Sequence, residues 1–209
     1  MIFFHQEWID AVCHAAQDGA VVSIPTDVSL TIQQDLVTIV FCCKDNPYLG
    51  FNKYQNDNDP LYEQEVFEVF ISGGSEPSES YLELEANPNG ALWAGVIQNP
   101  GLGLEGRPLQ TQFLTRQDHC ITLETWQKEN QWGGTLVFPL TLIPGHPANE
   151  FRFNFYRIVA KMPPQDKNWS CHVDNAHFLC LFPTLSGEQP AFHRPYMFGQ
   201  LINPIEASM

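Results

Sequence analysis

Short runs in which apolar and polar residues alternate, separated by turn-forming residues, dominate this chain and restrict its fold. Such runs are typical of strands, because successive side chains of a strand point to opposite faces. Most of them are bounded by Gly, Pro, Asn or Asp. The expected strands are 20–24, 28–33, 36–43, 65–72, 80–86, 91–97, 110–115, 119–126, 132–138, 151–160 and 196–202. They predict an all-β protein, a two-sheet antiparallel β-sandwich of jelly-roll type.

A short N-terminal helix is the expected exception to this pattern. Apolar residues recur there at helical spacing before Gly19, namely Trp8, Ile9, Val12, Ala15 and Ala16. The chain of 209 residues is predicted to form a single domain, 1–209, because all-β domains often reach this length undivided.

The charge of the chain is strongly acidic, with 24 Asp and Glu against 10 Lys and Arg. Such a surface repels phosphate backbones and anionic lipids, so we expect neither nucleic acid nor a membrane as a partner. The N-terminus lacks the basic region of a signal peptide, which predicts a cytoplasmic protein. The six cysteines show no C-x-x-C spacing and are expected to be reduced and mostly buried. The oligomeric state stays open.

Acidic residues recur regularly along two neighbouring strand candidates, 65–72 and 80–86. In the first, Glu68 lies on an otherwise apolar face. In the second, Glu83 and Glu85 share a face that is expected to meet water or a ligand, while the opposite face packs. This spacing raises the question of a functional site.

The run FRFNFYRIVA, 151–160, places Arg157 on an aromatic face and Arg152 and Asn154 on the opposite one. If this face and the face that carries Glu68 point into the same interior, Arg157 is expected to form a hydrogen-bonded ion pair with Glu68, because an unpaired buried charge is costly. The row with Arg152 and Asn154 offers hydrogen-bonding groups that suit a polyhydroxylated ligand or solvent.

Signatures of catalysis and of metal binding are weak. Glycoside hydrolysis needs two carboxylates, which Glu68, Glu83 or Glu85 could supply, but the sequence marks no cleft. The chain contains no G-x-S-x-G elbow, P-loop or H-E-x-x-H motif, so we expect neither an enzyme nor a zinc site. The loop with Asp57 and Glu63 has oxygen ligands suited to calcium but departs from the EF-hand pattern. A structural calcium therefore stays open, and no other cofactor is expected.

Five segments occur in order over about residues 36–202: EVFEVFI, YLELEANPNG, the strand around Trp132 that ends in Pro139, FRFNFYRI and FHRPYMFG. Together they resemble the family 9 carbohydrate-binding modules and their relatives in the DOMON-like β-sandwich group. The resemblance implies a sandwich that binds sugars without cleaving them, in carbohydrate catabolism. Two alternatives stay open: an interaction or scaffold protein that has lost the sugar site, and an accessory subunit of a glycoside hydrolase.

The resemblance also implies site residues for a mono- or oligosaccharide. Glu68 matches the glutamate that contributes to the sugar site in the V-E-x-F strand of the family. Phe182 stands where the family has a tryptophan that stacks on the sugar ring, and a phenylalanine offers a smaller platform. Arg152, Asn154 and Arg157 are expected to hydrogen-bond the hydroxyls. Glu68 is expected either to contact the ligand or only to pair with Arg157.

Overall fold

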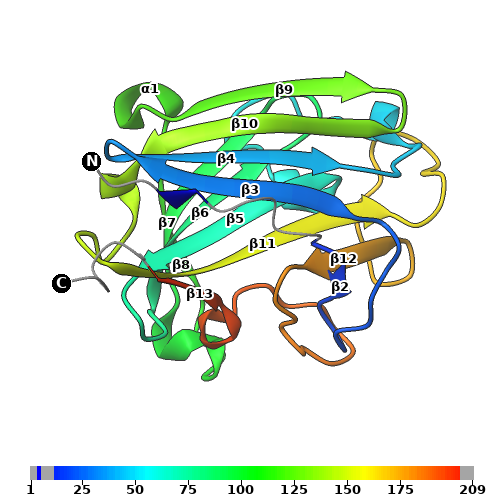
Figure 1. Ribbon diagram of the computed structural model, residues 1–209. Helices are drawn as coiled ribbons and strands as arrows, with labels where there is room; N and C mark the ends of the chain where they lie inside the picture. The colour runs from blue at the N-terminus through cyan, green and yellow to red at the C-terminus, as the bar shows by residue number, and fades with distance from the viewer. Residues whose placement is uncertain (1–3, 6–11, 203–209) are drawn as a thin grey trace.

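Two antiparallel β-sheets face each other and form a sandwich (Figure 1). The computed structural model describes residues 4–5 and 12–202. The first sheet has five strands in the order β1-β3-β4-β10-β9. They are β1 (Phe4–His5), β3 (Thr26–Gln33), β4 (Leu36–Cys43), β10 (Gln131–Pro139) and β9 (Thr122–Lys128). The all-β sandwich predicted from the alternating runs is confirmed.

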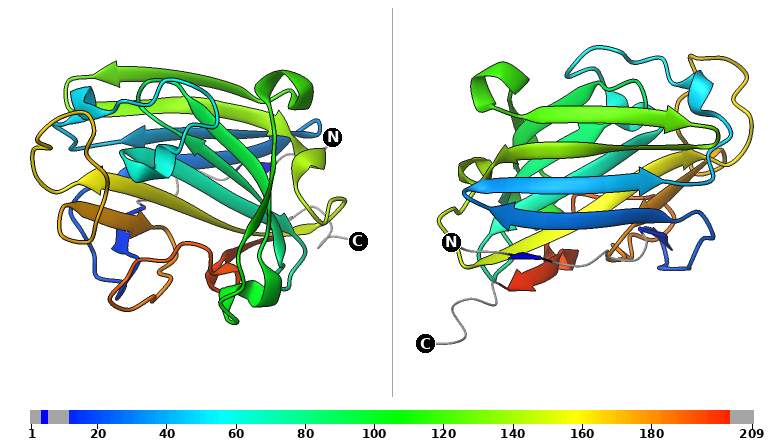
Figure 2. Two further views of the ribbon diagram at one scale, coloured as in Figure 1. Left: turned by 180° about the vertical axis from the view of Figure 1, so that it is seen from behind. Right: turned by 45° about the horizontal axis from the view of Figure 1, so that its top comes forward.

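The second sheet has eight strands in the order β2-β12-β11-β5-β6-β7-β8, with β13 paired to β11. They are β2 (His14–Ala15), β12 (Ala176–Cys180), β11 (Glu150–Ala160), β5 (Val66–Gly73), β6 (Ser80–Ala86), β7 (Leu92–Gln98), β8 (Gln110–Phe113) and β13 (Gly199–Ile202). The view from behind brings β5 to β8 forward (Figure 2). The helical segments are α1 (Arg116–His119) and the 3-10 turns Leu49–Phe51, Leu61–Glu63, Pro100–Gly103, Leu140–Leu142 and Pro195–Met197.

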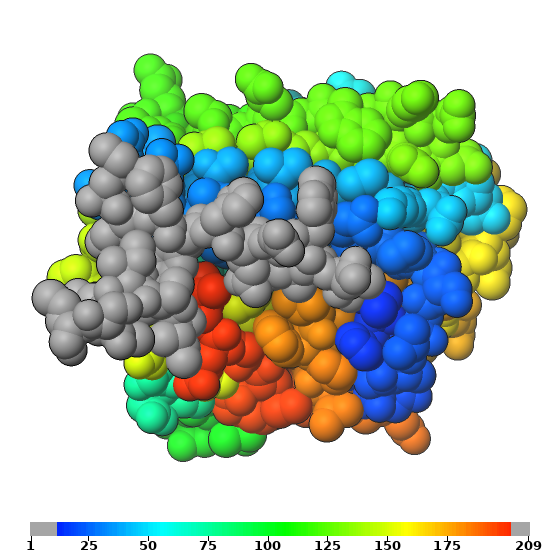
Figure 3. Space-filling view, viewed as in Figure 1, coloured from blue at the N-terminus to red at the C-terminus, as the bar shows by residue number. Residues whose placement is uncertain are grey.

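The predicted N-terminal helix is wrong in the part that the structure describes, and its residues 6–11 lie outside the described chain. His14–Ala15 forms β2, which pairs with β12 at the sheet edge. The backbone N–H of Ala16 donates to the carbonyl of Phe178 at 2.9 Å, so pairing with β12 replaces helical hydrogen bonds. Figure 3 shows these blue N-terminal residues against orange residues of the last third of the chain.

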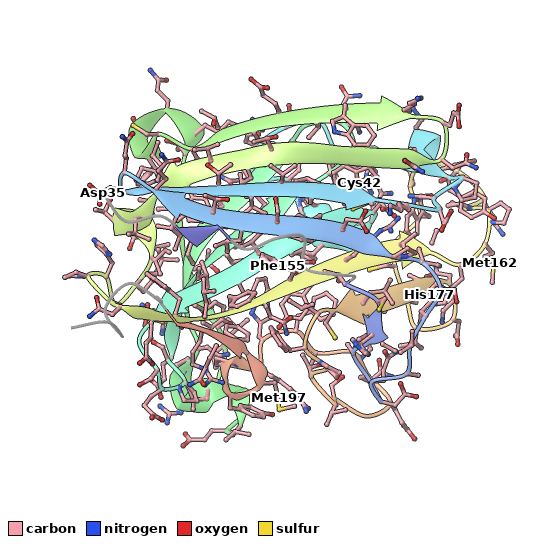
Figure 4. The ribbon with its side chains drawn as sticks, viewed as in Figure 1. Asp35, Cys42, Phe155, Met162, His177 and Met197 are labelled. Atoms are coloured by element: carbon pink, nitrogen blue, oxygen red, sulfur yellow. The ribbon has the colours of Figure 1, made fainter. Side chains whose placement is uncertain are left out.

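Aromatic rings fill the space between the two sheets. Phe41 of β4 stacks on Phe67 of β5 with ring centroids 4.2 Å apart, and Phe67 lies 5.8 Å from Phe155 of β11. Trp132 of β10 meets Phe41 edge to face. Figure 4 shows Phe155 between the layers. Stacked and edge-to-face pairs of this kind are favourable beyond the area that they bury, and they fix how the two sheets sit on each other.

Strand β5 is buried on both of its faces. Phe67 and Val69 point into the space between the sheets, whereas Val66 and Phe70 join a second apolar cluster on the outer face of the eight-stranded sheet. This second cluster includes Tyr81. The outer face of the sheet is therefore covered by other segments around β5, and polar side chains on that face are removed from water.

Gly133 of β10 is expected to resist substitution because neighbouring backbone occupies the space of a side chain. A Cβ atom there would lie 2.3 Å from the carbonyl oxygen of Phe41. We expect Gly133→Ala to lower the free energy of unfolding by about 1–3 kcal/mol, because strand β4 must shift. Gly50→Ala is the control, since no heavy atom lies within 4 Å of its Cβ position. Urea denaturation checks both variants, and equal stability would contradict the prediction.

All six cysteines are free thiols, as expected from their spacing. Cys43 and Cys180 are buried and Cys120 is exposed, and the other three are half-buried, so burial is less complete than the prediction had it. Within the described chain, none of the helices has the length and apolar character that a membrane span requires.

Candidate functional site

The ion pair predicted between Glu68 and Arg157 is wrong. Arg157 lies beside Phe67 in the strand register, and Glu68 lies beside Tyr156, so the two charged side chains point to opposite faces of one sheet. Arg157 instead donates from Nε to Oε1 of Glu65 at 3.1 Å, in the space between the sheets.

The pair of Arg157 and Glu65 is held by further hydrogen bonds. Trp132 donates from Nε1 to Oε1 of Glu65 at 2.8 Å. Arg157 donates from Nη1 to the carbonyl of Lys44 at 2.9 Å and to Oγ1 of Thr26 at 3.3 Å. Both members of the pair are buried. Arg157 therefore joins the two sheets and does not reach the outer face.

Arg152, Asn154 and Phe182 gather near the junction of β11 and β13. Nδ2 of Asn154 donates to the carbonyl of Phe182 at 2.8 Å, and its Oδ1 accepts from the backbone N–H of Phe182 at 3.0 Å. Arg152 donates to the carbonyls of Ser75 and Phe198. The ring of Phe182 packs over Gly199. These three side chains have partners inside the protein. None of them is among the residues that line the cleft described next, whereas Glu68 is.

A cleft of about 640 Å³ opens on the outer face of the eight-stranded sheet. Strands β5, β6, β7, β8, β11 and β12 provide its floor and one wall, and segments near residues 62, 171 and 190–193 provide the other. The residues that line it are Tyr62, Glu68, Glu83, Glu85, Trp93, Ile97, Leu109, Thr111, Phe113, Ile158, Cys171, Phe178, Pro190, Ala191, Phe192 and His193. Its volume lies within the range of small-molecule sites.

Three carboxyl groups form the floor of the cleft: Glu68 on β5 and Glu83 and Glu85 on β6. Glu68 lies directly opposite Glu85 across the two strands, and Glu83 lies opposite Phe70. Their exposed fractions are 2%, 4% and 0%, so of the two expected neighbours of Glu83 and Glu85, water or a ligand, water has little access to them. Oε1 of Glu68 and Oε2 of Glu83 have no hydrogen-bond partner among the described residues, and Glu85 lies close to Glu83 and to the backbone of Tyr62 without a well-aligned hydrogen bond.

The electrostatics of the floor follow from burial and from the proximity of like charges. Burial raises the pKa of Glu83 to about 8. Burial also raises the pKa of Glu68, and the charge of Glu83 raises it further. The pKa of Glu85 is raised by burial and then by the charges of Glu68 and Glu83. At neutral pH Glu83 is therefore mostly protonated, and a protonated carboxyl can both donate and accept hydrogen bonds.

Aromatic rings stand above the carboxyls. Tyr62, from a 3-10 turn, is 49% exposed, and Phe113, at the end of β8, is 56% exposed. Trp93 of β7 meets Phe113 edge to face at 5.5 Å between ring centroids. Phe178 and Phe192, whose ring centroids are 6.1 Å apart, also line the cleft. Hydrogen-bonding groups beneath exposed rings suit a ligand with both hydroxyl groups and an apolar face.

The structure is similar, over 94% of the chain, to two solved structures of a carbohydrate-binding module of family 9 from Caldicellulosiruptor kristjanssonii. The complex with cellotriose gives a TM-score of 0.56 at 13% identity, over 81% of that chain. The complex with glucose gives 0.55 at 14% identity, over 83% of that chain. The chain has the fold of the family 9 modules.

A third solved structure is similar to this chain. A protein from Bacteroides uniformis that is proposed to bind carbohydrate matches with a TM-score of 0.62 at 16% identity, over 94% of this chain and 85% of that one. No family model matches the sequence. At these identities the similarity concerns the fold, and the fold predicted from the five ordered segments is confirmed.

A curated sequence relative contradicts the predicted cytoplasmic location. It is named "Extracellular protein", comes from Arthroderma benhamiae, and is 29% identical over 140 residues. The match covers 64% of this chain and 63% of the relative, so the chain spans less than two thirds of that protein. The prediction was wrong because it rested only on the composition of the first residues.

The loop that suggested calcium does not assemble a metal site in this family 9 fold. Asp57 pairs with Arg116 at 2.6 Å and accepts from the backbone N–H of Leu92. Glu63 accepts a hydrogen bond from the hydroxyl of Tyr54. Across the described ranges, no group of three or more His, Cys, Asp or Glu side chains is placed to hold a metal ion. The carboxylates of this loop thus fasten it to its neighbours.

Tyr62 and Phe113 were missed by the sequence reasoning. Phe113 ends the run QTQF, whose alternation predicts a strand but does not show what its faces meet. Tyr62 belongs to a polar loop that is far from β8 in the sequence. Their position on one cleft depends on the packing of segments distant in sequence, and no local pattern signals it.

Proposed function

We propose that the protein is a non-catalytic carbohydrate-binding protein, linked to carbohydrate catabolism, that holds a mono- or oligosaccharide in the cleft. One observation carries the proposal: buried carboxyl oxygens without partners lie beneath half-exposed aromatic rings. Glu68 and Glu85 would hydrogen-bond the sugar hydroxyls, and Phe113 and Tyr62 would pack on the apolar C–H faces of the ring. The family 9 module of similar fold was solved with cellotriose and with glucose, which supports a sugar as ligand.

In this proposal the other predicted site residues hold the fold together and do not contact the ligand. Asn154 and Arg152 fasten β11 to the segments before β13, and Arg157 ties β11 to the facing sheet. Phe182 packs edge to face on Phe153 in the core. Of the five residues named from the sequence, Glu68 is the one proposed to touch the ligand.

Phe113→Ala tests the aromatic wall. We expect this change to weaken cellotriose binding about fivefold, or by about 1 kcal/mol, because one stacking face is removed. Isothermal titration calorimetry measures the affinity. Trp126→Ala is the matched control: Trp126 is 44% exposed and lies on β9 of the other sheet, away from the cleft. Equal affinities of the wild type and Phe113→Ala would contradict the proposed wall.

The same samples separate binding from hydrolysis. Two carboxyls at one site, one of them protonated near pH 7, are the groups that glycoside hydrolases use, and this favours a hydrolase as the second candidate. A binding protein leaves cellotriose intact after prolonged incubation, as chromatography would show. Release of glucose that is lost in Glu83→Gln would favour the hydrolase.

A further inference from the structure

The cleft floor concentrates acidic groups with no basic side chain opposite them. Neither Lys nor Arg is among the described residues that line the cleft. Arg157, on the neighbouring strand β11, points to the other face of the sheet and is paired with Glu65. Arg116, beside the neighbouring loop, is paired with Asp57. The protein itself therefore supplies no counter-charge for the three glutamates.

Every other titratable group on the cleft is neutral near pH 7. Burial raises the pKa of Cys171 to about 12 and also raises the pKa of Tyr62 and of Tyr156, which lies beside Glu68. Burial lowers the pKa of His193 to about 4, and its Nδ1 lies 2.7 Å from the hydroxyl of Tyr81. Only negative charge can develop in the cleft.

A metal ion is an unsuitable counter-charge for this floor. Although Glu68, Glu83 and Glu85 are neighbours, no set of three acidic, His or Cys side chains in the described chain has a geometry that would hold a metal. The surrounding rings of Trp93 and Phe113 are also poor metal ligands but favourable neighbours of an organic cation. Carboxyl oxygens without partners are then available to accept N–H donors.

We infer that the cleft selects a sugar carrying a free amino group, with the ammonium on the floor among Glu68, Glu83 and Glu85 and the sugar ring against the aromatic wall. The inference rests on the proposed sugar binding and names the class of sugar. An ammonium donates up to three hydrogen bonds and brings the positive charge that the floor lacks. The broad apolar walls favour a ring over a linear polyamine, because a ring presents a flat C–H face to Tyr62 and Phe113.

Three trisaccharides with the same β-1,4-linked ring skeleton test the inference by calorimetry. They are cellotriose, the trimer of glucosamine and the trimer of N-acetylglucosamine, which carry a hydroxyl, an ammonium and an acetamide at the same ring carbon. We expect the glucosamine trimer to bind at least about tenfold more tightly than cellotriose at low salt, and the acetylated trimer to show no such gain. Added salt should reduce this advantage, because the contact is between charges.

Proton release gives a readout that needs no variant. An ammonium on the floor favours the ionised carboxyls, so binding of the glucosamine trimer should expel protons that cellotriose leaves in place. The dependence of the binding heat on the ionisation enthalpy of the buffer measures this difference. Identical proton release for the two sugars would overturn the inference.

Carboxyl-to-amide variants show which residues cause the preference for the glucosamine trimer over cellotriose. In Glu83→Gln and Glu85→Gln, the affinity for the glucosamine trimer divided by the affinity for cellotriose should fall toward one. Glu124→Gln is the control, because it makes the same carboxyl-to-amide change at an exposed position on β9 of the other sheet, away from the cleft. An equal loss in Glu124→Gln would attribute the preference to overall charge and overturn the assignment.

The outcomes separate the inference from the proposed function. Equal affinity for cellotriose and the glucosamine trimer would overturn the amino-sugar preference and leave sugar binding intact. Binding of neither trimer, nor of the acetylated one, would refute the proposed function itself. Spermidine is the last probe: binding as tight as that of the glucosamine trimer would show that the floor recognises charge alone, and would overturn the assignment to a sugar.

Discussion

Replacing Arg157 by methionine is expected to lower the free energy of unfolding by about 3–5 kcal/mol. Arg157 is fully buried, and its partner Glu65 is buried too. Removing the guanidinium leaves Glu65 between the sheets with Trp132 and Asn46 as side-chain donors and without a positive charge beside it. It also leaves the carbonyl of Lys44 without the hydrogen bond from Nη1. Urea denaturation followed by tryptophan fluorescence measures the loss.

Two comparisons make the cause of this loss testable. Arg116→Met is the matched control, because Arg116 forms a partly exposed ion pair with Asp57, and such pairs contribute only about 0–1 kcal/mol. The double variant Glu65→Gln with Arg157→Met should be more stable than Arg157→Met alone, since no uncompensated charge stays buried. A cost for Arg157→Met as small as that for Arg116→Met would contradict the importance of the buried pair.

Stability of the ligand-free protein is expected to fall as the pH rises from about 4.5 to about 8. The pKa of Glu83 is raised from 4.5 to about 8 on folding, so over this window the unfolded chain has released a proton that the folded protein retains. Stability then decreases by about 1.4 kcal/mol per pH unit for one such group, or about 4–5 kcal/mol over the whole window. The raised pKa values of Glu68 and Glu85 act in the same direction.

Glu83→Gln removes the titrating group and should flatten this dependence. At pH 8 the variant is expected to be more stable than the wild type, and below about pH 4.5 the two should be similar, because glutamine resembles the protonated acid. Urea denaturation at a series of pH values measures the slopes. Glu124→Gln, which changes an exposed carboxylate, should keep the wild-type slope. A slope that persists in Glu83→Gln would show that another group or the overall charge causes it.

The strands of the sandwich could be predicted where alternation and turn residues coincide, as in β4, β5, β6 and β11. The strand β12 was missed, because Ala176–Cys180 is short and offers little alternation. The N-terminal helix was predicted from the spacing of apolar residues such as Val12, Ala15 and Ala16. Pairing of His14–Ala15 with the edge of the sheet overrides that local preference, and sequence spacing carries no information about an available edge.

The site was predictable only in part, and β5 shows why. Alternation correctly separated Glu65 from Glu68, but both faces of the strand are apolar, so the sequence did not show which face looks toward the second sheet. Arg157 was consequently paired with the wrong glutamate. The carboxyls Glu83 and Glu85 stood out in the sequence, yet their burial depends on segments that cover the outer face. The sequence of β6 does not show that other segments bury this face.

Burial of both faces of β5 also protects the alignment of this strand with its neighbours. A slip of one residue would turn Glu68 toward the space between the sheets and Glu65 toward the cleft. Arg157 and Trp132 would then lose their present acceptor, and Phe67 would leave the aromatic stack. A misaligned strand is therefore penalised in both layers at once. The buried charged residues thus favour a single pairing of the strands.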